Sequence, residues 1–232
     1  FNISNHNEAA IDTLMKQFMG IDRYIKFDEL PYDLIHHIDM HMKLLDEETM
    51  LLGEYPTGVA DGPQINANLT YLLDNYNSIF GTPYKIIRML MPPDQNDRYP
   101  DNNGDYRTFT NAVFINKTIL VPIYDEQYDT TALRIWREAM PCLKIVGIDC
   151  DAMIWASGAL HCITKAVATE DPLLIVHQPI REQDETAPFY TAEAKIQHRS
   201  GILSAQLFYR TDTNSTYSSV ALTSSNPAED LW

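Results

Sequence analysis

The chain has 232 residues, of which 45% are hydrophobic and 21% are charged, values typical of a folded protein that buries a core. No apolar run approaches the ~20 residues that a bilayer requires, so the sequence excludes a membrane span. The 32 acidic and 17 basic residues give a net charge of -15, which repels phosphate backbones. We therefore expect no nucleic-acid partner.

Three amphipathic helices are predicted in chain order from apolar residues at the i, i+3, i+4, i+7 spacing. They cover residues 8–19, 63–80 and 129–140. Gly81 and Pro83 are natural stop signals after the second helix, and Asp129 is a candidate cap of the third.

Short runs rich in β-formers lie between and after the helices, and polar turns such as Asp46-Glu47-Glu48 join several of them. The predicted strands are 37–45, 49–55, 84–91, 109–116, 117–124, 144–149, 158–167 and 172–177. With the helices they form a weak internal ββαβ repeat, whose third copy would start near Ala159 and Cys162. Repetition of such a unit indicates a circular or stacked architecture.

The residue pattern changes after about residue 185. Polar and apolar residues alternate there, β-branched and aromatic residues are frequent, and no apolar residues recur at helical spacing. We interpret it as the first strands of a β-sandwich. Fewer than fifty residues are too few for a complete sandwich of about 100 residues, so we expect this domain to be partial.

The predicted strand 37–45 alternates, which places His37 and Asp39 side by side on one face. In the corresponding strands of the later units, Asn111 is the polar member among apolar neighbours, and Cys162 follows His161, which strand alternation sends to the opposite face. If the units are related by rotation about an axis, His37, Asp39, Asn111 and Cys162 converge there. We expect Cys142 and Cys150 to be inert core residues, and His36 and His161 to be structural or surface residues.

The thiol, the imidazole and the carboxylate together suit attack on a guanidinium carbon. A thiolate is a strong nucleophile, and a histidine can protonate a leaving amine and then take a proton from water. A carboxylate matches the paired N–H donors of a guanidinium. The expected reaction expels ammonia and forms a covalent thiouronium adduct, which water later hydrolyses.

The segments that carry these residues resemble the motif set of the guanidine-modifying (pentein) superfamily. They are His37-Ile-Asp39, Thr110-Asn111 with Lys117-Thr-Ile-Leu-Val-Pro122, and Ala159-Leu-His-Cys162-Ile-Thr. The resemblance covers residues 8 to 180 approximately. It is to the branch that contains agmatine deiminases and bacterial peptidylarginine deiminases.

The resemblance implies an α/β fold that is part of a pseudo-fivefold α/β-propeller of ββαβ units, followed by the start of an immunoglobulin-like β-sandwich. Residues 1–180 would be the C-terminal portion of the catalytic propeller, with about three of five units, and residues 181–232 a partial immunoglobulin-like domain. Cys162 would be the nucleophile and His37 the general acid/base. Asp39 would bind the guanidinium, and Asn111 would help to position the thiol.

The resemblance further implies hydrolysis of peptidyl-arginine to peptidyl-citrulline, with no cofactor required. It places the second guanidinium-binding carboxylate and the substrate-carboxylate contacts in an N-terminal portion outside this chain. We expect that portion or a second copy of the chain as a partner, and a secreted or cell-surface location with the cytoplasm as the alternative.

Three other interpretations stay open. The chain could belong to an agmatine deiminase acting on a small free guanidine, or it could be a noncatalytic binding module with a structural thiol. The oxygen-rich loop with Asp94, Asp97, Asp101, Asn103 and Asp105 suits a structural calcium ion, or is simply a solvated acidic loop.

Overall fold

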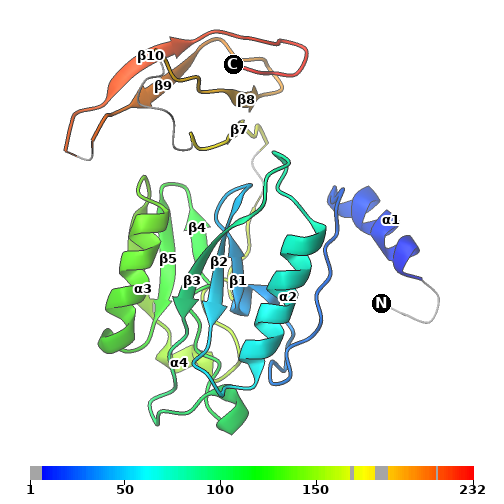
Figure 1. Ribbon diagram of the computed structural model, residues 1–232, viewed down its shortest axis with the longest axis vertical. Coiled ribbons are helices and arrows are strands. Elements are labelled where there is room, and N and C mark those ends of the chain that lie inside the picture. The colour runs from blue at the N-terminus through cyan, green and yellow to red at the C-terminus, as the bar shows by residue number, and fades with distance from the viewer. Residues whose placement is uncertain (1–6, 168–169, 181–187, 213) are drawn as a thin grey trace.

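The computed structural model describes residues 7–167, 170–180, 188–212 and 214–232. Two mixed α/β units form its centre, and four terminal strands lie in a separate layer beyond them (Figure 1). The N-terminal helix α1 (Glu8–Met19) lies to one side and buries none of its residues. Asn7 caps its start, and Gly20 ends it in the left-handed conformation with a φ of 68°.

The two central units have the same ββαβ topology. In the first, β1 (Met42–Leu44) pairs antiparallel with β2 (Thr49–Glu54), and β2 pairs parallel with β3 (Lys85–Leu90) after the crossover helix α2 (Asp61–Asn75). In the second, β4 (Val113–Ile115) and β5 (Thr118–Ile123) are antiparallel. Strand β6 (Lys144–Asp149) runs parallel to β5 after α3 (Glu126–Ala139). The predicted ββαβ repeat is therefore confirmed for these two units.

The register repeats as well as the topology. The parallel pairs begin with Thr49 opposite Lys85 in the first unit and with Thr118 opposite Lys144 in the second. A crossover helix is needed in each unit because parallel strands cannot be joined by a tight turn. Each helix turns an apolar stripe inward, and in α3 this stripe includes Ala132 and Trp136.

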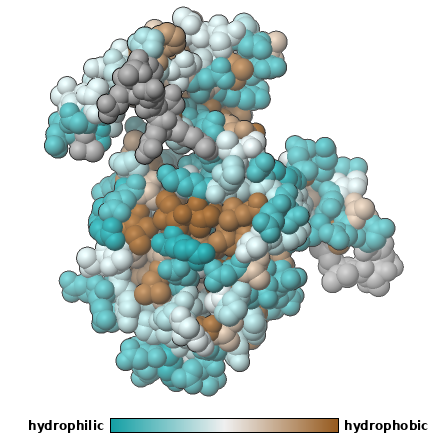
Figure 2. All heavy atoms as spheres, viewed as in Figure 1, coloured by the Kyte–Doolittle hydropathy of each residue, from teal (hydrophilic) through white to brown (hydrophobic). Residues whose placement is uncertain are grey.

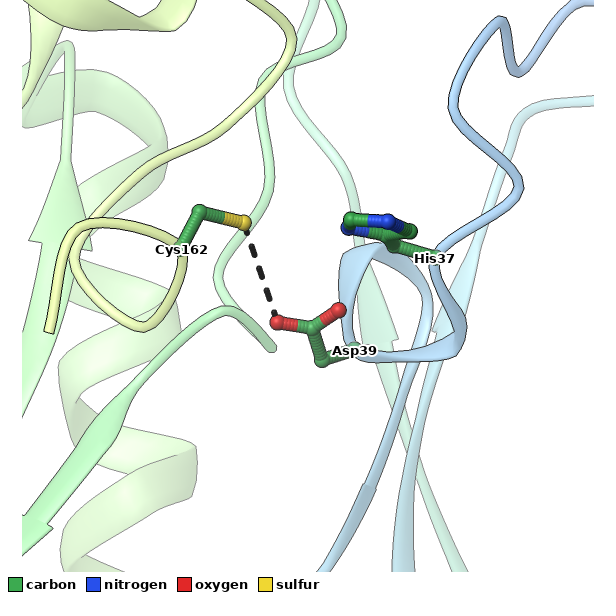
Figure 3. Close-up of side chains that lie close together, drawn as sticks. All are labelled: His37, Asp39 and Cys162. Atoms are coloured by element: carbon green, nitrogen blue, oxygen red, sulfur yellow. Dashed lines mark hydrogen bonds between the residues drawn. The ribbon is translucent and has the colours of Figure 1, made fainter. Parts of the chain in front are cut away.

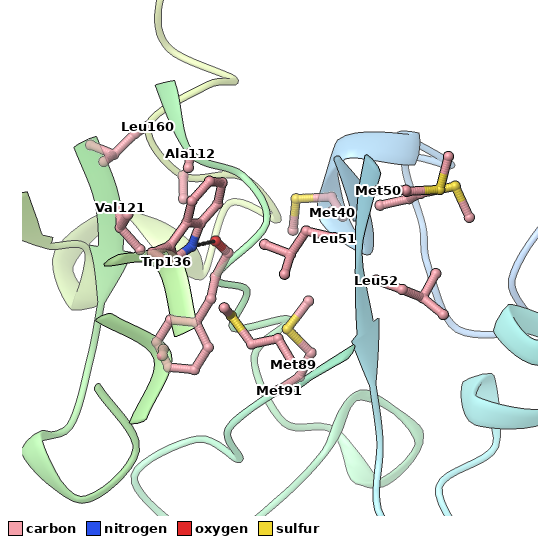
Figure 4. Close-up of a cluster of buried hydrophobic side chains, with 14 of the residues drawn as sticks. Met40, Met50, Leu51, Leu52, Met89, Met91, Ala112, Val121, Trp136 and Leu160 are labelled. Atoms are coloured by element: carbon pink, nitrogen blue, oxygen red, sulfur yellow. Dashed lines mark hydrogen bonds between the residues drawn. The ribbon is translucent and has the colours of Figure 1, made fainter. Parts of the chain in front are cut away.

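The hydrophobic core fills the space between the two units (Figure 4). Met40, Met89 and Met91 come from the first unit and meet Trp136 of the second. The flexible methionine side chains fill irregular gaps between sheet surfaces that are not flat. Gly53 makes room for Met91, because a Cβ there would lie 2.1 Å from the terminal carbon of the Met91 side chain, which would have to move.

Buried hydrogen bonds hold the segments of the second unit together. Trp136 is fully buried, and its Nε1 donates to the Phe109 carbonyl at 3.1 Å. The guanidinium of Arg107 is also buried, and it donates to the Pro93 carbonyl at 2.9 Å and to Asp151 at 2.6 Å. The second bond attaches the short helix α4 (Asp151–Ile154) to the segment that precedes β4.

Several predicted element boundaries are wrong. The third helix begins at Glu126 and is capped by Asp125 rather than Asp129, and the strand expected from residue 109 begins at Val113.

Two further differences have clear local reasons. Helix α2 ends at Asn75 rather than near residue 80, because Tyr76 is extended and residues 78–82 form their own hydrogen-bonded turn. Gly81 therefore belongs to that turn and does not end the helix. The first strand of the first unit begins at Met42 and not at His37, because residues Ile38–Met40 form a 3₁₀ helix, η2.

The predicted strand 158–167 is also wrong. After α4 the chain turns at Ser157, which has a positive φ of 59°, and turns again where the Thr164 N–H donates to the His161 carbonyl at 3.2 Å. Side chains in such turns do not alternate between two faces. The third ββαβ copy expected near Ala159 is therefore not formed in this segment.

The terminal strands form two antiparallel pairs among the described residues. Strand β7 (Leu174–His177) pairs with β8 (Ala194–Gln197), and β9 (Ala205–Tyr209) pairs with β10 (Ser218–Leu222). The expected boundary after residue 180 lies next to residues outside the described part of the chain. These two strand pairs do not by themselves show an immunoglobulin-like sandwich, so the partial immunoglobulin-like domain stays a prediction.

Candidate functional site

Asp39 is presented by the 3₁₀ turn η2, just before β1 enters the first sheet. The His37 carbonyl accepts the Met40 N–H at 3.1 Å and closes the turn. Met40 is fully buried and anchors the turn in the core, while the Asp39 carboxylate is 15% exposed. The sequence thus places a reactive carboxylate one residue from a core anchor.

Asn111 lies in a bend immediately before β4 and is fully buried. Its Nδ2 donates to Asp39 Oδ2 at 2.6 Å and to Cys162 Sγ at 3.1 Å. Next to it, the Thr110 hydroxyl donates to the Asp39 carbonyl at 2.9 Å. One buried amide therefore bridges the carboxylate of the first unit and the thiol of the loop after the second.

Cys162 lies in the turn that replaces the predicted third strand, and its side chain is exposed. Asn111 Oδ1 accepts the backbone N–H of His161 at 2.9 Å and that of Cys162 at 3.4 Å, which fixes the turn. Gly158 lies directly beneath the thiol. A Cβ at that position would be 3.1 Å from Cys162 Sγ, so only glycine leaves the sulfur undisturbed.

Figure 3 shows the thiol, the carboxylate and the imidazole of His37 facing one another from two different segments. The Cys162 thiol makes a long contact with Asp39 Oδ2 at 3.9 Å. The reactive atoms of His37, Asp39 and Cys162 all lie within 4.8 Å of one another. The structure therefore brings together the four residues that the sequence predicts for the site, and their roles stay predictions.

His161 is a site residue that the sequence interpretation missed. Its Nδ1 lies 2.6 Å from Asp39 Oδ2, although we expected a surface residue facing away from Cys162. The error has a physical cause, because strand alternation was applied to a turn. The one available signal was that His161 adjoins the predicted nucleophile.

Burial changes the titration of two neighbours of the site. It lowers the pKa of His41 to about 4, although the negative charges of Asp33 and Asp39 oppose this shift. Burial also lowers the pKa of Lys43, against the opposing effect of Asp39 and Cys162. His41 is buried, and neither of its ring nitrogens has a hydrogen-bond partner among the described residues.

The remaining candidates lie away from this cluster. Cys150 is buried, as expected, and burial raises the pKa of its thiol to about 11. Cys142 is exposed, so its assignment to the core was wrong, because it follows the end of α3 in a surface turn. His36 is exposed, with its Nε2 3.7 Å from a Glu29 carboxylate oxygen.

The acidic loop uses carboxylates for protein contacts. Asp94 accepts two hydrogen bonds from the Arg98 guanidinium, at 3.0 and 2.8 Å, and Asp101 accepts the Ala60 N–H at 2.9 Å. In the described part of the chain, one group of three histidine, cysteine or acidic side chains is close enough to hold a metal ion, and it consists of His37, Asp39 and Cys162. No residue of the acidic loop belongs to it. The calcium interpretation of the loop stays untested.

Asp39 has one carboxylate oxygen to spare. Asn111 and His161 both contact Oδ2, whereas Oδ1 has no hydrogen-bond partner among the described residues. The Asp39 side chain is 15% exposed, and a carboxylate oxygen free to accept, beside an exposed thiol, suits a flat N–H donor such as a guanidinium. The arrangement of a nucleophile, a proton carrier and a cation-binding carboxylate fits attack on a guanidinium carbon.

Comparisons with known proteins identify relatives that are deiminases of guanidine compounds. The profile of the Porphyromonas-type peptidyl-arginine deiminase family matches residues 4–167. A Vibrio parahaemolyticus protein assigned as an agmatine deiminase is 22% identical over 182 residues, which cover 69% of this chain and 49% of that protein.

Two solved structures show the same fold. One, assigned as an arginine deiminase from Porphyromonas gingivalis, has a TM-score of 0.59 and 25% identity, and the match covers 68% of this chain and 47% of that one. The agmatine deiminase of C. jejuni has a TM-score of 0.54 and 24% identity, with 67% and 46% covered. The chain therefore spans about half the length of these relatives.

The family profile and the fold place the chain in the guanidine-modifying (pentein) superfamily. Within it, the chain belongs to the Porphyromonas-type peptidyl-arginine deiminase family, whose relatives include agmatine deiminases. It is thus a member of a family of hydrolases that act on amidine C–N bonds. In the described part of the chain, no helix has the length and apolar character needed to cross a membrane.

Proposed function

We propose that the protein containing this chain hydrolyses the guanidinium of peptidyl-arginine to peptidyl-citrulline and ammonia. The observation that carries the proposal is the convergence of His37, Asp39 and Cys162, whose reactive atoms lie within 4.8 Å of one another. Buried Asn111 holds the carboxylate and the thiol together.

The first half of the reaction forms a covalent adduct. Asp39 Oδ1 accepts N–H groups of the guanidinium and aligns its carbon with Cys162. The thiolate adds to that carbon, His37 gives a proton to one nitrogen, and the C–N bond breaks to release ammonia. The product is a positively charged S-alkylthiouronium on Cys162.

The second half consumes one water molecule. His37 takes a proton from the water as its oxygen adds to the thiouronium carbon, and the C–S bond then breaks. The electron pair returns to sulfur, and the second proton of the water leaves to solvent, where the released ammonia takes it up as ammonium. The guanidinium has then become a urea, His37 is protonated again, and the thiolate is ready for another cycle. Asn111 Nδ2, 3.1 Å from the sulfur, donates to the thiolate at both stages.

Selective labelling of Cys162 tests the site on this chain. A haloacetamidine carries a guanidinium-like cation, whereas the matching haloacetamide is neutral and nearly the same size. We expect the amidine to label Cys162 faster than the amide, while exposed Cys142 serves as an internal reference in the same sample.

The variants His37→Ala and Asp39→Ala should abolish the rapid labelling and leave Cys142 unchanged. If both folded variants label Cys162 as fast as the wild type, the deiminase proposal fails and the site is that of a noncatalytic module. Peptide mass spectrometry after digestion measures each cysteine separately.

Agmatine is the alternative substrate, because relatives of this chain include agmatine deiminases. Incubating the protein with agmatine and with an arginine peptide, and measuring the ammonia released, shows which of the two is the substrate.

We propose that turnover needs no cofactor. Treatment with a chelator should therefore leave the rate unchanged, and a loss of activity restored by a metal would contradict this.

We further propose that the two described units are part of a fivefold propeller whose other units contact this chain. A continuous apolar area is visible on the face between α2 and α3 (Figure 2). We expect the remaining units of the same protein to cover such surfaces. The alternative is a second copy of this chain, and sedimentation of the purified chain distinguishes the two.

We propose a secreted or cell-surface location, or alternatively the cytoplasm, and cell fractionation tests this.

A further inference from the structure

The hydrogen bonds of the site converge on one oxygen of Asp39. Asn111 Nδ2 and His161 Nδ1 each lie 2.6 Å from Asp39 Oδ2, whereas Oδ1 has no hydrogen-bond partner among the described residues. The dashed line in Figure 3 joins Oδ2 to the thiol, and Oδ1 is the other oxygen, on the side of His37. The protein thus holds one oxygen of the carboxylate and leaves the other for a ligand.

The two short contacts come from different parts of the chain and together fix the orientation of the carboxylate. The last torsion of an aspartate side chain is soft, so a carboxylate that is held at one point can still rotate. Asn111 holds Oδ2 from the bend before β4, and His161 holds it from the turn after α4. With both bonds in place, Asp39 Oδ1 keeps one direction.

The contact with His161 also determines which ring nitrogen carries hydrogen. An ionised carboxylate only accepts hydrogen bonds, so His161 Nδ1 must be the donor. Proton transfer in the proposed reaction uses His37, and none of its steps uses the bond between His161 and Asp39. This bond is therefore a short contact at the site to which the reaction assigns no role.

The turn that carries Cys162 does not need the His161 side chain. Backbone atoms of His161 form the turn, because its N–H donates to Asn111 Oδ1 at 2.9 Å and its carbonyl accepts the Thr164 hydroxyl at 3.1 Å. The side chain itself is 50% exposed, and in the described part of the chain its hydrogen bond is the one to Asp39. The imidazole therefore acts on Asp39, and the backbone of the same residue acts on the turn.

We propose that His161 is a positioning residue for Asp39. By donating from Nδ1 to Oδ2, it aims Oδ1 at the N–H groups of the guanidinium and keeps the bound cation beside Cys162 and His37. The inference rests on the proposed function, since it concerns the binding of the same cation. Loss of the imidazole should therefore slow the reaction of the thiol with cationic reagents and not with neutral ones.

The ratio of two labelling rates of Cys162, one with a haloacetamidine and one with the matching haloacetamide, measures this role. Only the cationic amidine uses Asp39, whereas both reagents respond to the position of the thiol. His161→Phe keeps a ring without the donor, so it should lower the ratio about tenfold and leave the rate with the amide unchanged. His161→Asn places an amide nitrogen as far along the side chain as Nδ1 and should restore the ratio.

His198→Phe is the matched control, because it makes the same substitution away from the site. His198 lies in the terminal layer, where its Nδ1 is 2.7 Å from the Ser200 hydroxyl oxygen. Both labelling rates of Cys162 should stay at the wild-type values in this variant. Circular dichroism should show all three variants folded.

Three results would overturn the positioning role alone: an undiminished ratio in folded His161→Phe, an equal fall of both rates in that variant, or a ratio that stays low in His161→Asn. If wild-type Cys162 shows no preference for the amidine, the proposed function fails and the positioning role fails with it. Asp39→Ala separates the two failures. A wild-type preference that Asp39→Ala removes and His161→Phe keeps counts against His161 only.

Discussion

Replacement of Gly158 by alanine should slow the reaction of Cys162 without unfolding the protein. The new methyl group would lie 2.9 Å from Cys162 Cβ and 3.1 Å from its Sγ, whereas ordinary contacts begin at 3.4 Å. The turn must therefore open by about 0.5 Å, a shift of the order that separates reactive from unreactive geometry. Gly158 does not have a positive φ, so alanine adds no backbone strain of its own.

The displacement acts on the hydrogen bond that holds the sulfur. Asn111 Nδ2 lies 3.1 Å from Sγ, a close contact for a sulfur acceptor, and opening the turn moves the sulfur away from this donor. A misplacement of about 1 Å can cost about 100-fold in rate, so half of that should cost about tenfold. The loss of stability should stay below about 1 kcal/mol, because Cys162 is exposed and the turn can adjust.

The assay compares haloacetamidine labelling of Cys162 with that of Cys142 in the same sample, and urea unfolding measures stability. Gly62→Ala is the matched control, since a Cβ there finds its nearest neighbour at 3.8 Å, an ordinary contact. Wild-type labelling of Cys162 in folded Gly158→Ala would show that the thiol geometry does not depend on this close approach.

Three further predictions concern buried polar groups. Asn111→Ala should lower the free energy of unfolding by about 2 kcal/mol and slow the labelling of Cys162 about tenfold, because the amide joins the thiol to Asp39; unchanged labelling would contradict its positioning role. Trp136→Phe should cost about 2 kcal/mol, since the ring is fully buried and its N–H bonds to a carbonyl, and equal urea midpoints would refute this. The folded pKa of His41 is about 4 and its ordinary value is 6.5, so the unfolded chain binds the proton first as the pH falls. Its contribution to stability is therefore complete above pH 6.5 and decreases by about 3 kcal/mol as the pH falls to about 4. Unfolding curves of His41→Phe should show a smaller loss over this window, and an identical pH dependence would contradict the assignment.

The elements that the sequence predicts well are those whose pattern is local. The helix 8–19 matches α1, and the strand 144–149 matches β6, because their apolar spacing and caps lie within the element itself. The two complete ββαβ units follow from such elements and from the turn at Asp46-Glu47-Glu48. Their order along the chain leaves few alternatives for parallel pairing.

The segments that carry the site are predicted less well, because distant contacts shape them. The turn at Cys162 is fixed by backbone bonds to Asn111, 51 residues earlier in the chain, and no local pattern reveals such a partner. The 3₁₀ turn at Asp39 likewise depends on the Thr110 hydroxyl. The types of residue in the site could therefore be predicted from the sequence, whereas the orientation of the His161 side chain could not.

The site is built from contacts that cross between the units, so its geometry depends on the core beneath it. Asn111 Nδ2 also lies 3.7 Å from the sulfur of Met40, which packs in the core between the two sheets. A change in that core moves η2 relative to the bend before β4, and with them the carboxylate relative to the thiol. Because interiors are close-packed, such shifts are transmitted rather than absorbed. Substitutions at Met89 or Met91, which belong to this core, are thus expected to alter Cys162 reactivity together with stability, whereas substitutions of exposed residues in the terminal strands should alter neither.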